Sequence, residues 1–286
     1  MVSNKKGVGL KMSHYSVLVV TKGKPEYGDI ERILAPYDEN LSVAPYIGET
    51  AEQYLKNKRK NLEEYKNKGP YAEYLKDPVA YESKYGHNPH HLEYVKNFMT
   101  TYNMSDEELL RVRYEEYAHE PNEDEEPYID KDGNYITTYN PKSKWDWWVI
   151  GGRFSGSLVT KTGDEVNCGQ VKDIDFGQDI DYEHYKQDKE LVREYNHLIT
   201  EGDFYKPEYY KETYPSIEHY IKAIKQYSSF AFVNEEGEWF EKGEMGWFGM
   251  SSDTAEDRIN WVDNYYENLI KKLDENWYVT VVDCHI

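Results

Sequence analysis

The chain has 286 residues, which allow one large domain or two of ordinary size with a substantial buried core. Its formal charge of −20 argues against nucleic acid as a direct ligand, because binding to phosphates requires clustered Lys and Arg. Two cysteines provide no disulfide framework, and no apolar run approaches the roughly 20 residues of a membrane span. We therefore expect a soluble protein in a reducing cytoplasm, without membrane contact.

Charge and tyrosine content favour recognition of a protein partner. Residues 12–119 carry 14 basic and 18 acidic side chains, whereas residues 133–286 carry 16 and 29. An acidic surface can mimic DNA or steer association with a basic partner, although it also serves solubility alone. The 29 tyrosines supply contact area at low entropic cost, although most are expected to be boundary residues of helices.

The N-terminal part of the chain indicates one strand followed by helices. Residues 14–21 form a β-branched run typical of a buried strand, whereas residues 1–11 are expected to be a disordered extension. Capping boxes and helical spacing then predict three helices. They begin after Thr50, at His90 and after Ser105, and they end at Gly69-Pro70, at Tyr102 and near Ala118. We expect residues 49–119 to form a helical insertion or subdomain, a suitable place for a partner-specific surface.

The second half of the chain predicts hairpins, strands and further helices. Turn signals predict hairpins around Asp132-Gly133 and residues 235–237, and Asp253 is a good N-cap for a long helix. The other predicted elements are strands over 144–150, 154–160 and 277–284, and helices over 182–200 and 216–227. Strands at both termini with helices between them indicate an α+β fold, with a mainly antiparallel central sheet that contains both terminal strands. Residues 12–48 and 120–286 are expected to form this core.

The segment Trp145–Arg153 is the densest candidate for a ligand site. In a strand, Trp145 and Trp147 would share one face and Asp146 would lie on the other. Across the following glycine turn, Arg153 is the candidate partner for Asp146. The rings could form a platform for a base or nucleotide, with Arg153 holding an anion. The alternative, which we favour, is an aromatic core hairpin with a buried Asp–Arg pair.

The C-terminal run Asp283-Cys284-His285 contains residue types suited to catalysis or metal binding. Side chains alternate in an extended strand, so Cys284 would point away from Asp283 and His285. A cysteine nucleophile would need a base from elsewhere, and His14 on the N-terminal strand is the candidate. We favour the alternative of a buried cysteine, flanked by an aspartate and a histidine that make structural hydrogen bonds.

Two other segments carry weaker signals. His87, His90 and His91 would need further ligands to bind zinc, and they more simply mark the start of a helix. Glu244 and Trp247 lie in a glycine-flanked aromatic loop, which could bind a ligand or place Trp247 in the core. The sequence shows no catalytic triad order, nucleotide fingerprint or metalloprotease helix, so we predict no catalytic residue, metal or cofactor.

Three segments of the chain resemble one family of bacteriophage and prophage proteins. They are Met12–Val20 (MSHYSVLVV), Lys144–Phe154 (KWDWWVIGGRF) and Thr280–Ile286 (TVVDCHI). Members of that family carry MSHFTVLV, KWDWYxxGGRW and TVVDCHI at the corresponding places, and Gly237–Gly249 fits the same pattern. The resemblance extends from Met12 to the last residue, and its motifs are specific, whereas the family has little assigned function.

The phage context of this family implies an anti-defence protein that binds its target without catalysis. Such a protein would bind a bacterial immune complex in the host cytoplasm, with the Gabija nuclease–NTPase complex as the first candidate, and block DNA binding or cleavage. It would need no cofactor and is expected to be a homo-oligomer, with several copies bound per target. The alternative is a small-ligand or nucleotide-binding enzyme that uses Trp145, Asp146, Trp147, Arg153, Glu244, Trp247, Asp283 and His285.

Overall fold

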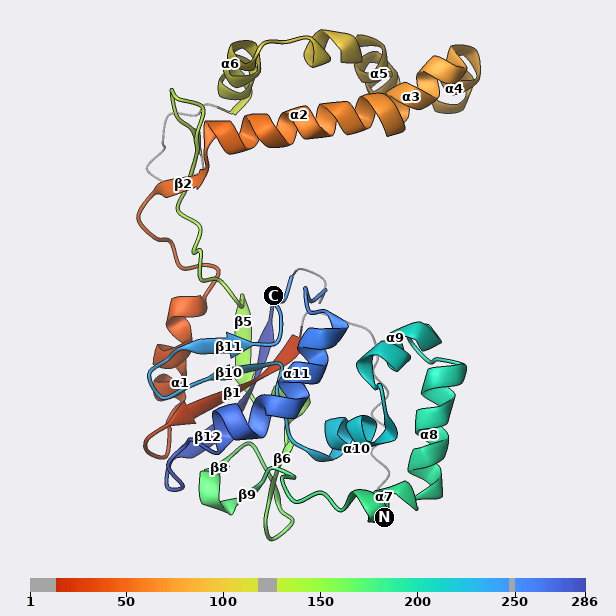
Figure 1. Ribbon diagram of the computed structural model, residues 1–286. Coiled ribbons are helices and arrows are strands. Elements are labelled where there is room, and N and C mark those ends of the chain that lie inside the picture. The colour runs from red at the N-terminus through yellow and green to blue at the C-terminus, as the bar shows by residue number, and fades with distance from the viewer. Residues whose placement is uncertain (1–13, 118–127, 247–249) are drawn as a thin grey trace. The chain divides into compact units, whose positions relative to one another are not determined.

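A computed structural model describes residues 14–117, 128–246 and 250–286 of the chain (Figure 1). The chain divides into two compact units. We call residues up to Leu41 together with Asn140–Ile286 the sheet unit, and Ser42–Tyr139 the helical unit. Among the described helices, none is long and apolar enough to span a membrane. The predicted disordered extension, residues 1–11, lies outside the described residues.

The sheet unit is built on a mixed, mainly antiparallel sheet that contains both terminal strands. Strand β1 (His14–Thr21) pairs antiparallel with β12 (Tyr278–His285) and parallel with β10 (Ala231–Val233). The order of the described strands is β11-β10-β1-β12-β5, and β8 also pairs with β12. The remaining strands of this sheet are β5 (Trp147–Ile150), β8 (Cys168–Gln170) and β11 (Trp239–Glu241). The predicted α+β fold, with both terminal strands in the central sheet, is confirmed.

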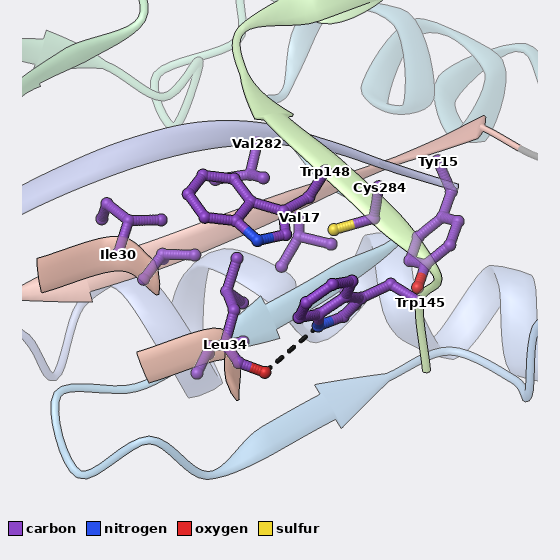
Figure 2. Close-up of a cluster of buried hydrophobic side chains, with 11 residues drawn as sticks. Tyr15, Val17, Ile30, Leu34, Trp145, Trp148, Val282 and Cys284 are labelled. Atoms are coloured by element: carbon purple, nitrogen blue, oxygen red, sulfur yellow. Dashed lines mark hydrogen bonds between the residues drawn. The ribbon is translucent and has the colours of Figure 1, made fainter. Parts of the chain in front are cut away.

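Both faces of the two terminal strands are buried. On one face, Val17 of β1 and Cys284 of β12 pack against α1 (Tyr27–Leu34), as Figure 2 shows. On the other face, Leu18 and Val281 pack in a second cluster. Full burial of one such aliphatic side chain contributes about 1.5–3 kcal/mol. The terminal strands therefore form the centre of the core, as their apolar character on both faces predicts.

The helices around this sheet differ in part from the prediction. The predicted helix 182–200 is interrupted, because the Asp188 carboxylate accepts hydrogen bonds from the N–H groups of Glu190 and Leu191 and so begins a second helix. The N-cap of the last helix is Thr254 and not Asp253, because Thr254 forms a reciprocal capping box with Asp257. The helices of the described sheet unit are α1, α7 (Tyr182–Lys186), α8 (Lys189–Thr200), α9 (Pro207–Thr213), α10 (Ile217–Lys225) and α11 (Ala255–Tyr265), which a π-helical turn (Tyr266–Ile270) continues.

The strand predicted over 154–160 is shorter and belongs to a different sheet. A 3-10 turn, Gly152–Phe154, follows β5 directly. Strand β6 (Leu158–Thr160) then pairs with β7 (Glu165–Val166) and β9 (Ile174–Asp175) in a small separate sheet. The predicted aromatic hairpin between β5 and the following strand is therefore wrong.

The helical unit contains the three predicted helices and two more between them. Both predicted capping boxes form, at Thr50 with Gln53 and at Ser105 with Glu108. Its own apolar cluster centres on the buried Leu62, Phe98 and Leu109. The elements are α2 (Ala51–Lys68), α3 (Pro70–Lys76), α4 (Pro78–Tyr85), α5 (Pro89–Tyr102) and α6 (Asp106–Tyr117), with strands β2 (Tyr46–Glu49), β3 (Tyr128–Ile129) and β4 (Tyr135–Thr137).

This unit is wider than the predicted insertion of residues 49–119, because three strands belong to it. The buried Arg113 of α6 donates hydrogen bonds to Glu49 Oε2 at 2.7 Å and to the carbonyl oxygen of Gly133 at 3.0 Å. It thereby joins a helix to β2 and to the turn of the β3–β4 hairpin. The boundaries of the unit consequently fall at Ser42 and Tyr139.

Candidate functional site

The three motifs that carry the family resemblance meet at one end of the central sheet. The strand register places His14 of β1 opposite His285 of β12, and His285 opposite Trp147 of β5. Asp283, two residues before His285, has its side chain on the same face of β12. We call the group of His14, Asp146, Asp283 and His285 the His–Asp cluster.

The cluster consists of two histidine–carboxylate pairs. His14 Nδ1 lies 2.8 Å from Asp283 Oδ1, and His285 Nδ1 lies 2.7 Å from Asp146 Oδ1. The centroids of the two imidazole rings are 5.0 Å apart. A carboxylate at Nδ1 orients the ring and favours the tautomer with the proton on that nitrogen. The Nε2 atoms of both rings are then suited to accept a proton or to bind a further group.

Asp283 is the buried centre of the cluster. Its residue is 1% exposed, and its Oδ2 accepts a hydrogen bond from the backbone N–H of Arg153 at 2.8 Å. Gly152, with a φ of 52°, brings the backbone this close, and a Cβ at that position would overlap with the side chain of Asp283. A buried carboxylate requires such donors, because water no longer solvates it. The glycine pair of the KWDWWVIGGRF motif therefore serves to bind a carboxylate of the TVVDCHI motif.

We expect Gly152→Ala to destabilise the sheet unit by about 2 kcal/mol or more, since it adds a clash with Asp283 to the roughly 1–3 kcal/mol of a strained backbone. Gly163→Ala is the matched control, because Gly163 also has a positive φ of 91° but has no atom within 4 Å of the added Cβ. Urea unfolding measures both free energies. Equal losses in the two variants would show that the close approach to Asp283 contributes nothing.

Cys284 lies on the opposite face of β12 and is fully buried. Burial, and after it the negative charge of Asp283, raises the pKa of the Cys284 thiol well above its usual value. His14 interacts with Asp283 on the other face, so it is not placed as the base of a Cys284 nucleophile. This arrangement agrees with the alternative that we favour from the sequence, a buried cysteine flanked by an aspartate and a histidine that make hydrogen bonds.

The tryptophans of the central motif separate into core and surface. Trp145 and Trp148 are 7% and 8% exposed and pack in the cluster of Figure 2, where Trp145 Nε1 donates to the Leu34 carbonyl oxygen at 3.1 Å. Trp147 is 49% exposed, and its ring centroid is 5.8 Å from that of His14. The prediction that Trp145 and Trp147 share one face is wrong, because β5 begins only at Trp147. Trp145 therefore provides no ligand platform.

The partners predicted for Asp146 and Arg153 also differ from those in the structure. Asp146 accepts its hydrogen bond from His285, whereas Arg153 contacts the other carboxylate, Asp283, through its backbone. Asp146 and Arg153 thus belong to one site, but they do not pair with each other as predicted. Asp146 pairs with His285, and the backbone of Arg153 pairs with Asp283. Sequence reasoning missed this exchange, because it depends on the pairing of β5 with β12.

The remaining predicted residues do not join the cluster. Glu244 is exposed, and its backbone N–H donates to Ser252 Oγ at 2.9 Å, whereas Trp247 lies outside the described residues. His91 Nε2 lies 2.8 Å from the Tyr81 hydroxyl oxygen at the start of α5, in keeping with a helix-start role. Within the described ranges, no group of three or more His, Cys, Asp or Glu side chains could hold a metal ion.

A third carboxylate lies near the His285–Asp146 pair. Partial burial, followed by the charges of Asp146 and Asp38, raises the pKa of Glu39, whereas His285 lowers it. Two histidines, each backed by a carboxylate and with rings 5.0 Å apart, have the geometry to donate and accept protons at one bound group. The same contacts would also serve to fasten three strands together.

We identify the His–Asp cluster from its geometry and from the sequence motifs that contain its residues. Searches of protein-family profiles, curated proteins and solved structures found no match to this chain.

Proposed function

We propose that this chain is a phage-encoded anti-defence protein that binds and inhibits a bacterial immune complex without catalysis. The Gabija nuclease–NTPase complex is the first candidate, and the blocked step would be its binding or cleavage of DNA. The resemblance to phage and prophage proteins supports the biological context. The observation that carries a binding role is the helical unit, a compact body with its own core inserted between two parts of the sheet unit.

The helical unit offers apolar side chains that a partner could bury. Val79 of α4 is 80% exposed and Leu75 of α3 is 58% exposed, and Tyr94 of α5 and Tyr114 of α6 are also exposed. Protein interfaces concentrate their binding energy in a few such anchors, which polar residues surround. Ion pairs Lys84–Glu73 and Lys96–Glu82 lie on the same helices and could form the polar rim.

Co-purification with the Gabija nuclease and NTPase subunits tests the target. We expect a complex with the wild-type chain and a much weaker one with Val79→Asp, because an aspartate at the centre of an apolar contact loses hydration without gaining a partner. Phe204→Asp is the matched control, since Phe204 is 45% exposed in the sheet unit. The absence of any complex at micromolar concentration would exclude Gabija as the target. We also propose that the chain forms a homo-oligomer, and light scattering would measure the molar mass of that oligomer.

Association with a basic partner that handles DNA should slow as salt rises. The acidic residues of the C-terminal half would steer the encounter, and exposed charges are largely screened beyond about 8 Å at physiological ionic strength. Stopped-flow rates at low and high salt should therefore differ several-fold. An association rate that does not change with salt would leave the acidic surface with a role in solubility alone.

The His–Asp cluster favours a second candidate function, a small-ligand or nucleotide-binding enzyme. Its support is the convergence of four polar side chains from three motifs. His285→Ala tests it, because His285 is partly exposed and its loss should leave the chain folded. His197→Ala is the control, since His197 Nδ1 also faces a carboxylate, Glu201, at 3.4 Å. A folded His285→Ala protein with full anti-defence effect would exclude a catalytic role of this histidine.

A further inference from the structure

A pocket of about 410 Å³ lies beside the His–Asp cluster within the sheet unit. It is a half-open pocket lined by the start of β1 and by residues of α9, α10 and α11, and His14 is part of its wall. Its volume is within the range of small-molecule sites, about 300–1,000 Å³. Although the chain has 54 acidic residues, none of the described side chains that line this pocket is an aspartate or a glutamate. The described lining therefore contains two basic side chains, Lys242 and Arg258, and no acidic one.

Lys242 is the first of two cations in the pocket wall. Its side chain is partly buried, and its Nζ lies 5.1 Å from the centroid of the Phe230 ring. No carboxylate in the described ranges lies within ion-pair distance of this Nζ. Burial, and also the nearby Arg258, lowers the pKa of Lys242, whereas Asp253 raises it. An anion bound in the pocket would give this ammonium group the partner that it lacks.

Arg258 is the second cation, and its neighbours hold it in place. Its Nη1 donates to the backbone oxygen of Asp253 at 3.0 Å and to Oδ2 of that residue at 3.1 Å. Its Nε donates to Thr213 Oγ1 at 3.2 Å, and the Tyr209 ring lies 4.6 Å from its Cζ. Among the described residues, no acceptor contacts Nη2. A guanidinium fixed on one side with donors remaining on the other is preorganised for an anion.

Aromatic side chains form much of the remaining wall. They include Tyr214, Phe230 and Trp261, which come from three separate segments of the chain. Rings of this kind present apolar faces on which a planar group can stack, and such stacking contributes about 1–3 kcal/mol per nucleic acid base. Hydroxyl groups of Ser16 and Ser228 also line the pocket and can hydrogen bond to a polar ligand.

We propose that this pocket binds a nucleoside monophosphate, with the phosphate at Lys242 and Arg258 and the base among the aromatic rings. A free mononucleotide fits the pocket better than a long strand, because the net charge of −20 repels a polyanion. The ligand would lie next to His14, whose Nδ1 is occupied by Asp283. The inference concerns binding alone, so it holds whether or not the His–Asp cluster is catalytic and whichever immune complex the chain binds.

Isothermal titration of the full chain with AMP, GMP, CMP and UMP tests this ligand class. We expect at least one monophosphate to bind more tightly than its nucleoside and than inorganic phosphate, because only the monophosphate uses both the cations and the rings. A 5′-phosphorylated oligonucleotide distinguishes the source of the phosphate: tighter binding than the mononucleotide would assign the pocket to a strand end. If none of the four monophosphates binds at millimolar concentration, the proposal is wrong.

Lys242→Gln locates the binding in this pocket. Loss of a charge-assisted contact should weaken binding of the monophosphate about tenfold or more, whereas Lys242→Arg should retain most of it. Lys211→Gln is the matched control, since it removes one positive charge from an exposed position on α9 that does not line the pocket. Thermal unfolding shows whether each variant is folded. Equal affinities of the folded Lys242→Gln and Lys211→Gln proteins would overturn the proposal.

Discussion

Replacing residues 42–139 with a short glycine–serine linker is expected to leave a folded sheet unit that no longer binds the immune complex. The three buried clusters of the sheet unit draw all their described residues from that unit. Its central strands β1 and β12 pair with each other directly, so the sheet does not depend on the helical unit for its order. We therefore expect the shortened chain to keep one cooperative urea transition.

The two cut points lie close enough for a short linker. Asn140 Nδ2 donates hydrogen bonds to the backbone oxygens of Pro36 and Asp38, each at 2.9 Å, so the chain returns to the place where it left. A parallel bridge between Asp38 and Trp145 continues this contact. A flexible linker of a few residues therefore costs little loop-closure entropy.

This deletion separates two explanations of binding. A folded sheet unit that fails to co-purify with the partner would place the binding surface on the helical unit. A folded sheet unit that still binds would place the surface on the sheet unit and its acidic residues. Loss of the cooperative transition would contradict the independence of the sheet unit. Removing only residues 49–119 would be a poorer test, because it leaves β3 and β4 without the helices with which they form a unit.

Much of the fold follows from signals that are local in the chain. The capping boxes at Thr50 and Ser105 start helices where the sequence predicts them, because both partners lie within one turn. Helix α1 is not among the predicted helices, although Ile30, Ile33 and Leu34 recur at helical spacing and all pack against the core. Its capping box, Glu26 with Asp29, lacks the serine or threonine that marks the others.

The His–Asp cluster could be predicted only in part, because its contacts are remote in sequence. His14 and Asp283 are 269 residues apart, and Asp146 and His285 are 139 residues apart. Strand alternation correctly separates Cys284 from its neighbours, but it cannot say which strands pair or in which register. The same rule misplaces Trp145, because the regular strand starts at Trp147, three residues later than predicted. The pocket is lined in part by motif residues such as His14 and Lys242, but no local pattern in the sequence predicts that Lys242 and Arg258 meet there.

Asp283→Ala is expected to destabilise the sheet unit by about 3 kcal/mol, because it removes a buried carboxylate that accepts two hydrogen bonds. The substitution removes the acceptor of two partly buried hydrogen bonds, from His14 Nδ1 and from the Arg153 N–H. Asp283→Asn should lose less, because it keeps the volume and one acceptor oxygen. Urea unfolding at neutral pH measures each free energy.

Comparison with Asp146→Ala shows how much of the stability lost in Asp283→Ala depends on the burial of the carboxylate. Both pairs have histidine–carboxylate distances of 2.7–2.8 Å, but the Asp146 side chain is 34% exposed and that of Asp283 only 2%. A partly exposed pair is solvated in either state and contributes at most about 1 kcal/mol. We therefore expect Asp146→Ala to cost no more than about a third of the loss in Asp283→Ala. Equal losses would mean that Asp146 supports the sheet as strongly as Asp283 does, which would make the cluster a structural fastening of β1, β5 and β12. A small loss at Asp146, combined with loss of the anti-defence effect, would instead identify the exposed His285–Asp146 pair as the functional half of the cluster.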